Sequence, residues 1–189
     1  MRKLFFALFL SMLGIGMALA ETIDGITYTL NISTSTATVT DTPSGSVVIP
    51  ATVKNNNRTY NVTAIAGVNS GITSCEIPEG VTSISTAFSY KSSLISIVIP
   101  STVQRIENDA FARCTSLISV TLPEGLTYIG DQAFGGCTAL PNITIPSTIT
   151  SMGKKSFINC TNLMKIVWNA KKCVDFASYD AAPFNMRTF

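Results

Sequence analysis

Cysteine is the residue type in this chain best suited to metal binding or to disulfide formation, and its spacing is regular. Cys114, Cys137 and Cys160 follow one another at a constant interval, and Cys75 and Cys173 bring the total to five. A structural zinc site needs cysteines or histidines in closely spaced pairs, and the chain contains no histidine. The spacing therefore favours free, buried thiols that act as small apolar side chains. A disulfide, either Cys160 to Cys173 or between stacked members of the column, is the alternative.

Residues for catalysis are scarce. The absence of histidine excludes Ser-His-Asp and Cys-His catalysis. Glu79 and Glu124 occupy equivalent positions after two expected strands, but Ser101 and Ser147 take that position in the units between and after them. The sequence thus gives no support for the paired carboxylates of a glycosidase. We predict that the protein is not an enzyme and that it has no metal site and no cofactor.

The N-terminus has the pattern of a secretory signal peptide. Arg2 and Lys3 precede an apolar run over residues 4–13, and small residues at Ala18 and Ala20 suit a signal peptidase. We therefore predict that residues 1–20 are removed on export. The apolar run is shorter than the roughly 20 residues that a membrane-spanning helix needs, so no transmembrane segment is expected in the mature chain. A retained membrane anchor is the alternative.

The charge balance argues against nucleic acid as a partner. Removal of Arg2 and Lys3 leaves 11 basic residues against 11 acidic ones, so the mature chain has no net positive charge. Proteins that bind nucleic acid need a basic surface. Only 13% of residues are charged and 46% are hydrophobic, which is the composition of a folded chain.

Three residue types repeat with one period through most of the chain. Proline after an aliphatic residue recurs at almost the same interval as the column of cysteines, and phenylalanine recurs at the identical interval. The members are Pro78, Pro100, Pro123 and Pro146 for proline, and Phe88, Phe111, Phe134 and Phe157 for phenylalanine. A fixed period of about 23 residues predicts a solenoid of stacked units.

Residues 117–137 show one complete unit. The alternation over residues 119–121 predicts a short strand with its middle side chain pointing inward, and Pro123 ends the strand because proline has no N–H to donate. Residues 130–134 have the length of a single helical turn on the opposite side. We therefore predict an α/β repeat fold: a solenoid with a parallel β-sheet on one face and short helical turns on the other.

The same unit resembles a known repeat. The pattern Leu-x-x-Val-x-Leu-Pro-x-x-Leu-x-x-Ile-Gly-x-x-Ala-Phe-x-x-Cys, from Leu117 to Cys137, is similar to the BspA-like leucine-rich repeat, also called the Treponema-pallidum type. The resemblance covers about residues 72–168, and residues 24–28 and 47–50 are similar to the section that precedes such repeats. It implies an exported or surface-displayed bacterial protein, in some cases an adhesin, and no catalytic residues.

The N-terminal end departs from this pattern. The unit between Ile65 and Ile72 is shortened and lacks the Ala-Phe and Cys elements. Atypical units are expected at the ends of a solenoid. We therefore assign residues 21–71 to an N-terminal section and cap, and residues 72–168 to the leucine-rich repeats.

The C-terminal end departs as well. Trp168 replaces the aliphatic residue that ends each strand, and Asn169 replaces the proline. Residues 169–189 are therefore an atypical end. Either residues 181–189 fold back as a cap, or the chain is a truncated member of a longer family.

The outward positions of the predicted strands are the candidate ligand-binding surface. They form two columns of small hydroxyl and branched aliphatic side chains, which suit a polymer or protein partner better than an enclosed small molecule. The predicted ligand-binding residues are Ser96, Val98, Ser119, Thr121, Asn142, Thr144, Lys165 and Val167. Two alternatives remain: these residues only satisfy strand propensity, or the binding surface lies at the aromatic and basic end formed by Trp168, Lys171, Lys172 and Tyr179.

These observations together predict a non-catalytic, adhesin-like binding module. We expect it to be secreted or displayed at the cell surface, with the periplasm as the alternative location. Its expected partner is a protein or a glycan, such as host extracellular matrix. The alternative function is a structural or assembly protein of the cell envelope that associates with another copy through its open C-terminal end.

Overall fold

The computed structural model describes residues 18–171. The N-terminal section of these residues is a five-stranded sheet. Its strand order is β1-β2-β3-β6-β5, with β3 and β6 parallel and the other pairs antiparallel. The strands are β1 (Ala18–Ile23), β2 (Ile26–Asn31), β3 (Thr36–Asp41), β5 (Thr52–Asn55) and β6 (Arg58–Ile65). Asp24 and Gly25 join β1 to β2 with φ values of 50° and 81°, as a two-residue hairpin turn requires.

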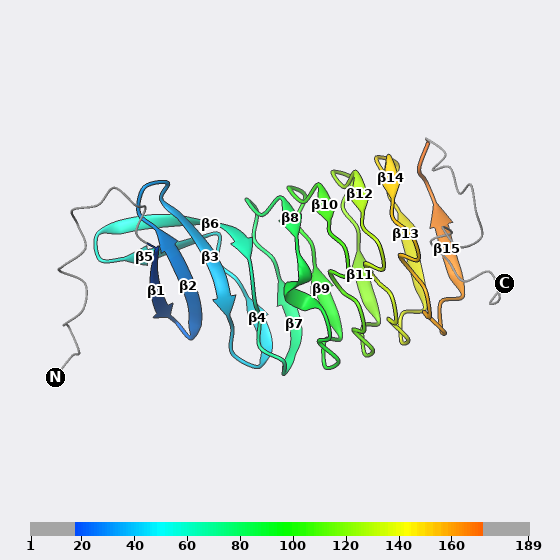
Figure 1. Ribbon diagram of the computed structural model, residues 1–189, viewed down its shortest axis with the longest axis horizontal. Coiled ribbons are helices and arrows are strands. Elements are labelled where there is room, and N and C mark those ends of the chain that lie inside the picture. The colour runs from blue at the N-terminus through cyan, green and yellow to red at the C-terminus, as the bar shows by residue number, and fades with distance from the viewer. Residues whose placement is uncertain (1–17, 172–189) are drawn as a thin grey trace.

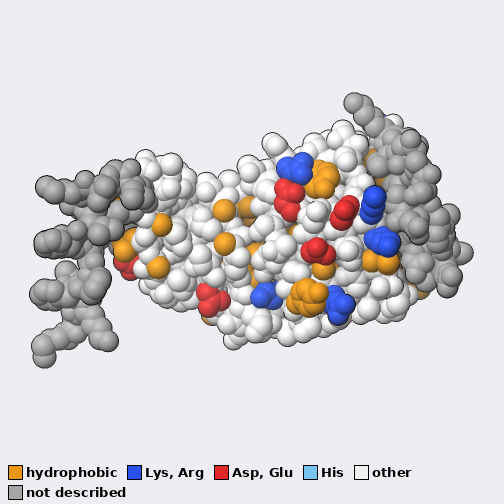
Figure 2. All heavy atoms as spheres, viewed as in Figure 1, with side chains coloured by type: hydrophobic (Ala, Val, Ile, Leu, Met, Phe, Trp, Pro, Cys, Tyr) orange, Lys and Arg blue, Asp and Glu red, His pale blue; other side chains and the backbone are white. Residues whose placement is uncertain are grey.

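The rest of the described chain is a stack of coils that runs from left to right in Figure 1, with parallel strands on two of its sides. We call the first the long-strand face. Its strands are β4 (Gly45–Val48), β7 (Ile72–Glu76), β9 (Ser96–Val98), β11 (Ser119–Thr121), β13 (Asn142–Ile145) and β15 (Lys165–Trp168). We call the second the short-strand face, and it contains β8 (Ser83–Ile84), β10 (Arg105–Ile106), β12 (Tyr128–Ile129) and β14 (Ser151–Met152). Acidic and basic side chains are interspersed over the side of the molecule shown in Figure 2.

The third side of each coil, which we call the turn side, corrects the predicted fold class. Helical turns were expected there, but within residues 18–171 the 3-10 helix η1 (Thr86–Phe88) is the single helical element. The fold is therefore a β-solenoid with a spacing of about 23 residues, and the prediction of an α/β fold was wrong. None of the helices among residues 18–171 is long and apolar enough to cross a membrane.

The backbone of the turn side explains why helical turns do not form. Asp109, Gln132 and Lys155 have φ values of 58°, 52° and 56°, whereas a right-handed helical turn needs negative φ throughout. In addition, alternate N–H groups donate to the next coil instead of to their own segment. Phe111 N, for example, donates to Ala133 O at 2.7 Å, and Phe134 N donates to Ser156 O at 2.8 Å.

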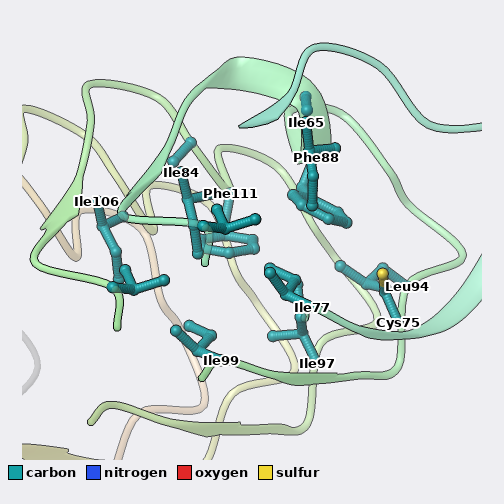
Figure 3. Close-up of a cluster of buried hydrophobic side chains, with 14 of the residues drawn as sticks. Ile65, Cys75, Ile77, Ile84, Phe88, Leu94, Ile97, Ile99, Ile106 and Phe111 are labelled. Atoms are coloured by element: carbon teal, nitrogen blue, oxygen red, sulfur yellow. The ribbon is translucent and has the colours of Figure 1, made fainter. Parts of the chain in front are cut away.

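The core of the array is a stack of like side chains. The rings of Phe88, Phe111, Phe134 and Phe157 are stacked with centroid separations of 5.5, 5.1 and 5.2 Å, close to the spacing of the strands that position them. In Figure 3, Ile65 of β6 points toward the same interior as Phe88. The N-terminal sheet therefore contributes to the same continuous hydrophobic core as the coils.

The N-terminal sheet also joins the array through β4. This strand pairs in parallel with β7, so the segment predicted to be the N-terminal section and cap includes the first strand of the long-strand face. Ala18 to Ala20, at the predicted signal-peptidase site, form the first half of β1 and pair with residues 29–31 of β2. Most of the predicted signal peptide and the predicted C-terminal cap over residues 181–189 lie outside the described residues.

Candidate binding surface

The structure brings the eight predicted ligand-binding residues together on the outward side of β9, β11, β13 and β15. The register aligns Ser96 with Ser119 and Val98 with Thr121. On the next pair of strands it aligns Asn142 with Lys165 and Thr144 with Val167. Ser96 and Val167 are half-buried and the other six are exposed. The two columns inferred from the sequence are therefore rows of neighbouring side chains within each of two sheets, β4-β7-β9-β11 and β13-β15, which follow one another along the long-strand face.

The surface extends further toward the N-terminus than the sequence analysis placed it. Ser46 and Val48 of β4 align with Ser74 and Glu76 of β7, and the hydroxyls of Ser46 and Ser74 are 2.6 Å apart. The β5–β6 hairpin lies between these strands in the sequence and lengthens the interval to 28 residues, which hid the repeat. The signal that could have found β4 is the Val-Ile-Pro end shared by residues 48–50 and 98–100.

A row of exposed apolar side chains borders the serine column. Ile95, Ile118 and Met164 precede β9, β11 and β15, and they are 44%, 53% and 80% exposed. Backbone hydrogen bonds between coils hold this row in place, including Ile118 N to Ile95 O at 3.0 Å. These residues were not among the predicted ligand-binding residues. The signal was the Leu117-Ile118 pair, since adjacent residues in extended backbone leading into a strand point to opposite sides.

The long-strand face carries little charge among the described residues. Glu76 on β7 and Lys165 on β15 are the charged members of its two outward columns. The short-strand face differs, because Arg105 forms an ion pair with Glu107 at 2.8 Å and lies 4.0 Å from the ring centroid of Tyr128. Hydrogen bonds from Arg105 lower the pKa of Glu107. Arg105, Glu107 and Tyr128 on or beside the short-strand face are thus paired with one another, whereas the polar groups on the long-strand face are mostly small hydroxyls.

Glu79 and Glu124 have structural partners. The carboxylate of Glu79 accepts hydrogen bonds from the backbone N–H and hydroxyl of Ser101 in the next coil, at 3.2 and 3.1 Å. Glu124 bonds Ser147 in the same way, at 3.1 and 2.9 Å. Burial alone would raise the pKa of Glu79, but the hydrogen bonds from Ser101 and the next residue outweigh it and lower the pKa. Each carboxylate therefore forms hydrogen bonds that link two neighbouring coils.

The cysteines of the column are free, buried thiols, as predicted. The Sγ atoms of Cys114, Cys137 and Cys160 each donate to a phenylalanine carbonyl of the preceding coil, at 3.1, 3.2 and 3.1 Å. Burial raises the pKa of Cys114 to about 12 and that of Cys160 to about 11. These thiols stay protonated at neutral pH and are poor nucleophiles. Cys173 lies outside the described residues, and residues 18–171 contain no cluster of side chains suited to a metal ion.

The alternative surface at the C-terminal end is described in part. Trp168 ends β15 with 37% of its surface exposed, whereas the equivalent Ile145 is fully buried. Lys171 is exposed. Lys172 and Tyr179 lie outside the described residues, so this surface stays a prediction.

Comparisons with known proteins agree with the geometry. The family model described as "BspA type Leucine rich repeat region" matches residues 82–179 with six copies. A leucine-rich repeat protein from Bacteroides ovatus has a similar structure, with a TM-score of 0.71 and 32% identity; the match covers 78% of this chain and 40% of that one. A leucine-rich repeat protein from Treponema pallidum matches with a TM-score of 0.67 and 22% identity, over 78% of this chain and 71% of that one. No curated protein sequence matches the chain.

Proposed function

Because this chain belongs to the BspA-type leucine-rich repeat family, we propose that it is an exported, non-catalytic binding module that holds a protein or glycan partner on its long-strand face. Leucine-rich repeat proteins of this kind are generally binding modules without catalytic activity. The chain spans 40% of the length of the Bacteroides ovatus protein, so the partners of a longer relative are not assigned to it. A site on this fold has to be argued from its own residues.

The observation that supports this site is the alignment of outward side chains across successive strands. Neighbouring strands are about 4.8 Å apart, so six strands present a surface roughly 25 Å across. Its outward columns combine small hydroxyls with exposed aliphatic side chains, such as Val98 at 57% and Val48 at 65% exposure. Such a surface offers hydrogen bonds and apolar contacts over an extended length, which suits a polymer or a protein.

Lysine substitutions in the centre of this face test the proposal. Thr121→Lys together with Thr144→Lys places two long charged side chains in one outward column, and the neighbouring column already contains Lys165, so the fold tolerates lysine here. We expect binding to a panel of matrix proteins and glycans to fall at least about tenfold, which corresponds to about 1.4 kcal/mol.

A matched control separates loss of the site from a change in net charge. Gln104→Lys with Ser151→Lys adds the same charge at exposed positions on or beside the short-strand face and should leave binding unchanged. Equal binding by the Thr121/Thr144 variant and the parent protein would move the site away from the long-strand face. A ligand lost equally in both lysine variants would indicate a general charge effect.

Export is the second part of the proposal, and it is tested on producing cells. Mass spectrometry of the mature protein should find Glu21 as its first residue, because Ala18 and Ala20 suit signal peptidase. Protease treatment of intact cells should release peptides from residues 72–168 if the protein is displayed outside. Peptides found only after lysis would place it in the periplasm and would weaken the adhesin-like function.

The alternative function, assembly through the C-terminal end, has its own test. Light scattering over a range of concentrations should show a monomer if the protein is a binding module alone. A dimer that disappears when residues 174–189 are deleted would favour assembly. Trp168 on the last described strand, which is 37% exposed where the equivalent Ile145 is fully buried, is the observation that keeps this alternative open.

A further inference from the structure

A column of left-handed residues runs along the turn side, outside the proposed binding face. Tyr90, Arg113, Gly136 and Asn159 occupy equivalent positions in successive coils, with φ values of 60°, 59°, 75° and 58°. Their N–H groups donate to the next coil where one follows, as in Tyr90 N to Ala112 O and Arg113 N to Gly135 O, both at 2.7 Å. The fold therefore imposes this conformation on whichever residue occupies the position.

Two of the four residues suit this conformation and two do not. Glycine and asparagine adopt a positive φ at little cost, whereas tyrosine and arginine are disfavoured there. Burial does not compensate, because Tyr90 is 65% exposed and Arg113 is exposed. The guanidinium of Arg113 lies 5.4 Å from the ring centroid of Tyr90, a distance at which an exposed cation–π contact is weak. Contacts within the chain thus do not explain the choice of these two residues.

The chemistry of these side chains fits an acidic protein partner. Tyrosine and arginine are the residue types that most often dominate binding at protein interfaces. Lys91, next to Tyr90, adds a second positive charge, and both Lys91 and Asp109 on the same turn side are half-buried. An uncharged glycan would leave both cations unpaired, whereas the acidic side chains of a protein segment would pair with them, so a protein partner is favoured here. We propose that Tyr90, Lys91 and Arg113 form a second binding surface for an acidic segment of a partner protein.

The variant Tyr90→Asn with Arg113→Asn tests this proposal without weakening the fold. Asparagine is the residue that the chain itself uses at position 159 of the column. Relief of the backbone strain should raise the melting temperature by about 2–4 °C per site. In an NMR titration of the unaltered protein with an octaglutamate peptide at low salt, we expect amide shift changes centred on residues 90, 91 and 113. The variant should lose them.

A charge-matched control exists in the neighbouring column. Gln132 and Lys155 are also exposed and left-handed, so Gln132→Asn with Lys155→Asn relieves similar strain and removes one positive charge, as the test variant does. It should gain stability and keep the peptide shifts. The proposal is overturned by a less stable Tyr90/Arg113 variant, by peptide shifts absent or located elsewhere, or by their equal loss in the control. Shifts with a heparin oligosaccharide but not with octaglutamate would overturn the protein partner.

Discussion

The N-terminal sheet and the coil array are both built from β-strands, but contacts of different range hold them together. In the N-terminal sheet, β1 and β2 pair across a two-residue turn, so their contacts are local in sequence. In the array the strand pairs of the described chain are parallel, and their contacts join equivalent positions of successive coils, as the bond between Ser147 and Glu124 does. The short turn of a hairpin brings its own two strands together, whereas a coil is stable only between neighbouring coils.

This difference predicts how far the destabilising effect of a substitution should spread. In the array each side chain contacts its equivalents in the coils before and after it, so a defect in one coil weakens both neighbours. In the N-terminal sheet alternate residues face one core, and a defect should stay within the hairpins. Because the two regions share one continuous core, the boundary between them can be tested.

The largest effect is expected at the centre of the phenylalanine stack. Phe134 is fully buried and stacks on Phe111 and Phe157 at 5.1 and 5.2 Å, so Phe134→Ala should cost about 3–5 kcal/mol. Denaturant unfolding measures the loss, and hydrogen exchange locates it. Exchange should rise in the coils around residues 111–157 and stay slow in the N-terminal sheet.

The matched variant lies in that sheet. Tyr28 is 1% exposed, and Tyr28→Ala should speed exchange in β1 to β3 before it affects the distant coils. If either variant raises hydrogen exchange equally in both regions, the N-terminal sheet and the coil array unfold as one cooperative unit. That result would contradict the difference in range between their contacts.

A smaller loss is expected from close backbone contacts between coils. A Cβ atom on Gly130 would lie 2.4 Å from the backbone nitrogen of Asn108 in the preceding coil, so Gly130→Ala should cost about 3 kcal/mol. Gly25 in the β1–β2 turn has a φ of 81°, and no atom lies within 4 Å of the position that a Cβ atom would take there. Gly25→Ala should therefore cost only about 1 kcal/mol, from backbone strain alone. Urea unfolding measures the free energy lost in each variant. Equal losses in Gly130→Ala and Gly25→Ala would contradict the idea that contacts between coils make the array more sensitive than a local turn.

Alkaline pH should lower the stability of the coil array, which contains the buried cysteines, and so distinguish it from the N-terminal sheet. Burial raises the pKa of Cys160 to about 11 from 9.0, so the unfolded chain loses this proton first and stability falls as the pH rises above 9 toward 11. Each buried thiol contributes at most about 1.4 kcal/mol per pH unit in this range. Cys114→Ala should remove one such contribution, because the folded-state pKa of Cys114 is also raised, to about 12.

Stability measured between pH 8 and the alkaline limit checks this slope. Hydrogen exchange corrected for its own pH dependence should show the loss in the coils between about pH 9 and 10, since Cys75 on β7 is the first cysteine of the described residues. Above pH 10 the N-terminal sheet should weaken too, because burial also raises the pKa of Tyr28 from 10.0. An unchanged slope in Cys114→Ala would mean that the thiols are accessible to solvent in the folded protein.

The sequence predicted those features of the fold that are set by one residue type recurring at a fixed interval. The period, the family, the inward phenylalanines and the buried cysteines all follow from side chains that recur at one interval, because stacking equivalent positions buries them together. The outward columns followed from the same register. Their role in binding is still a prediction.

What the sequence did not predict depends on the backbone. The length of residues 130–134 fits one helical turn, but the positive φ of Gln132 and the bonds to the next coil exclude it. A hint was available at one position, where Gly136 and Asn159 are one repeat apart, since these two residue types favour a left-handed conformation. The same comparison would have marked Tyr90 as unusual. The place of β4 was missed because the inserted hairpin breaks the period.

The smallest effect is expected at the carboxylates that fasten alternate coils. Glu124→Ala removes the hydrogen bonds to the N–H and hydroxyl of Ser147, both at the surface, and should cost about 1 kcal/mol. The next junction along the chain, between the coils of Ser147 and Asn169, has alanine at position 170 in place of a partner, so Ser147→Ala should cost no more than Glu124→Ala. The double variant tests whether the two side chains act only on each other. If they do, the double variant loses the same free energy of unfolding in urea as Glu124→Ala alone. An additive loss would show that Ser147 stabilises its own coil, and the array would then be less dependent on neighbours than the N-terminal comparison implies.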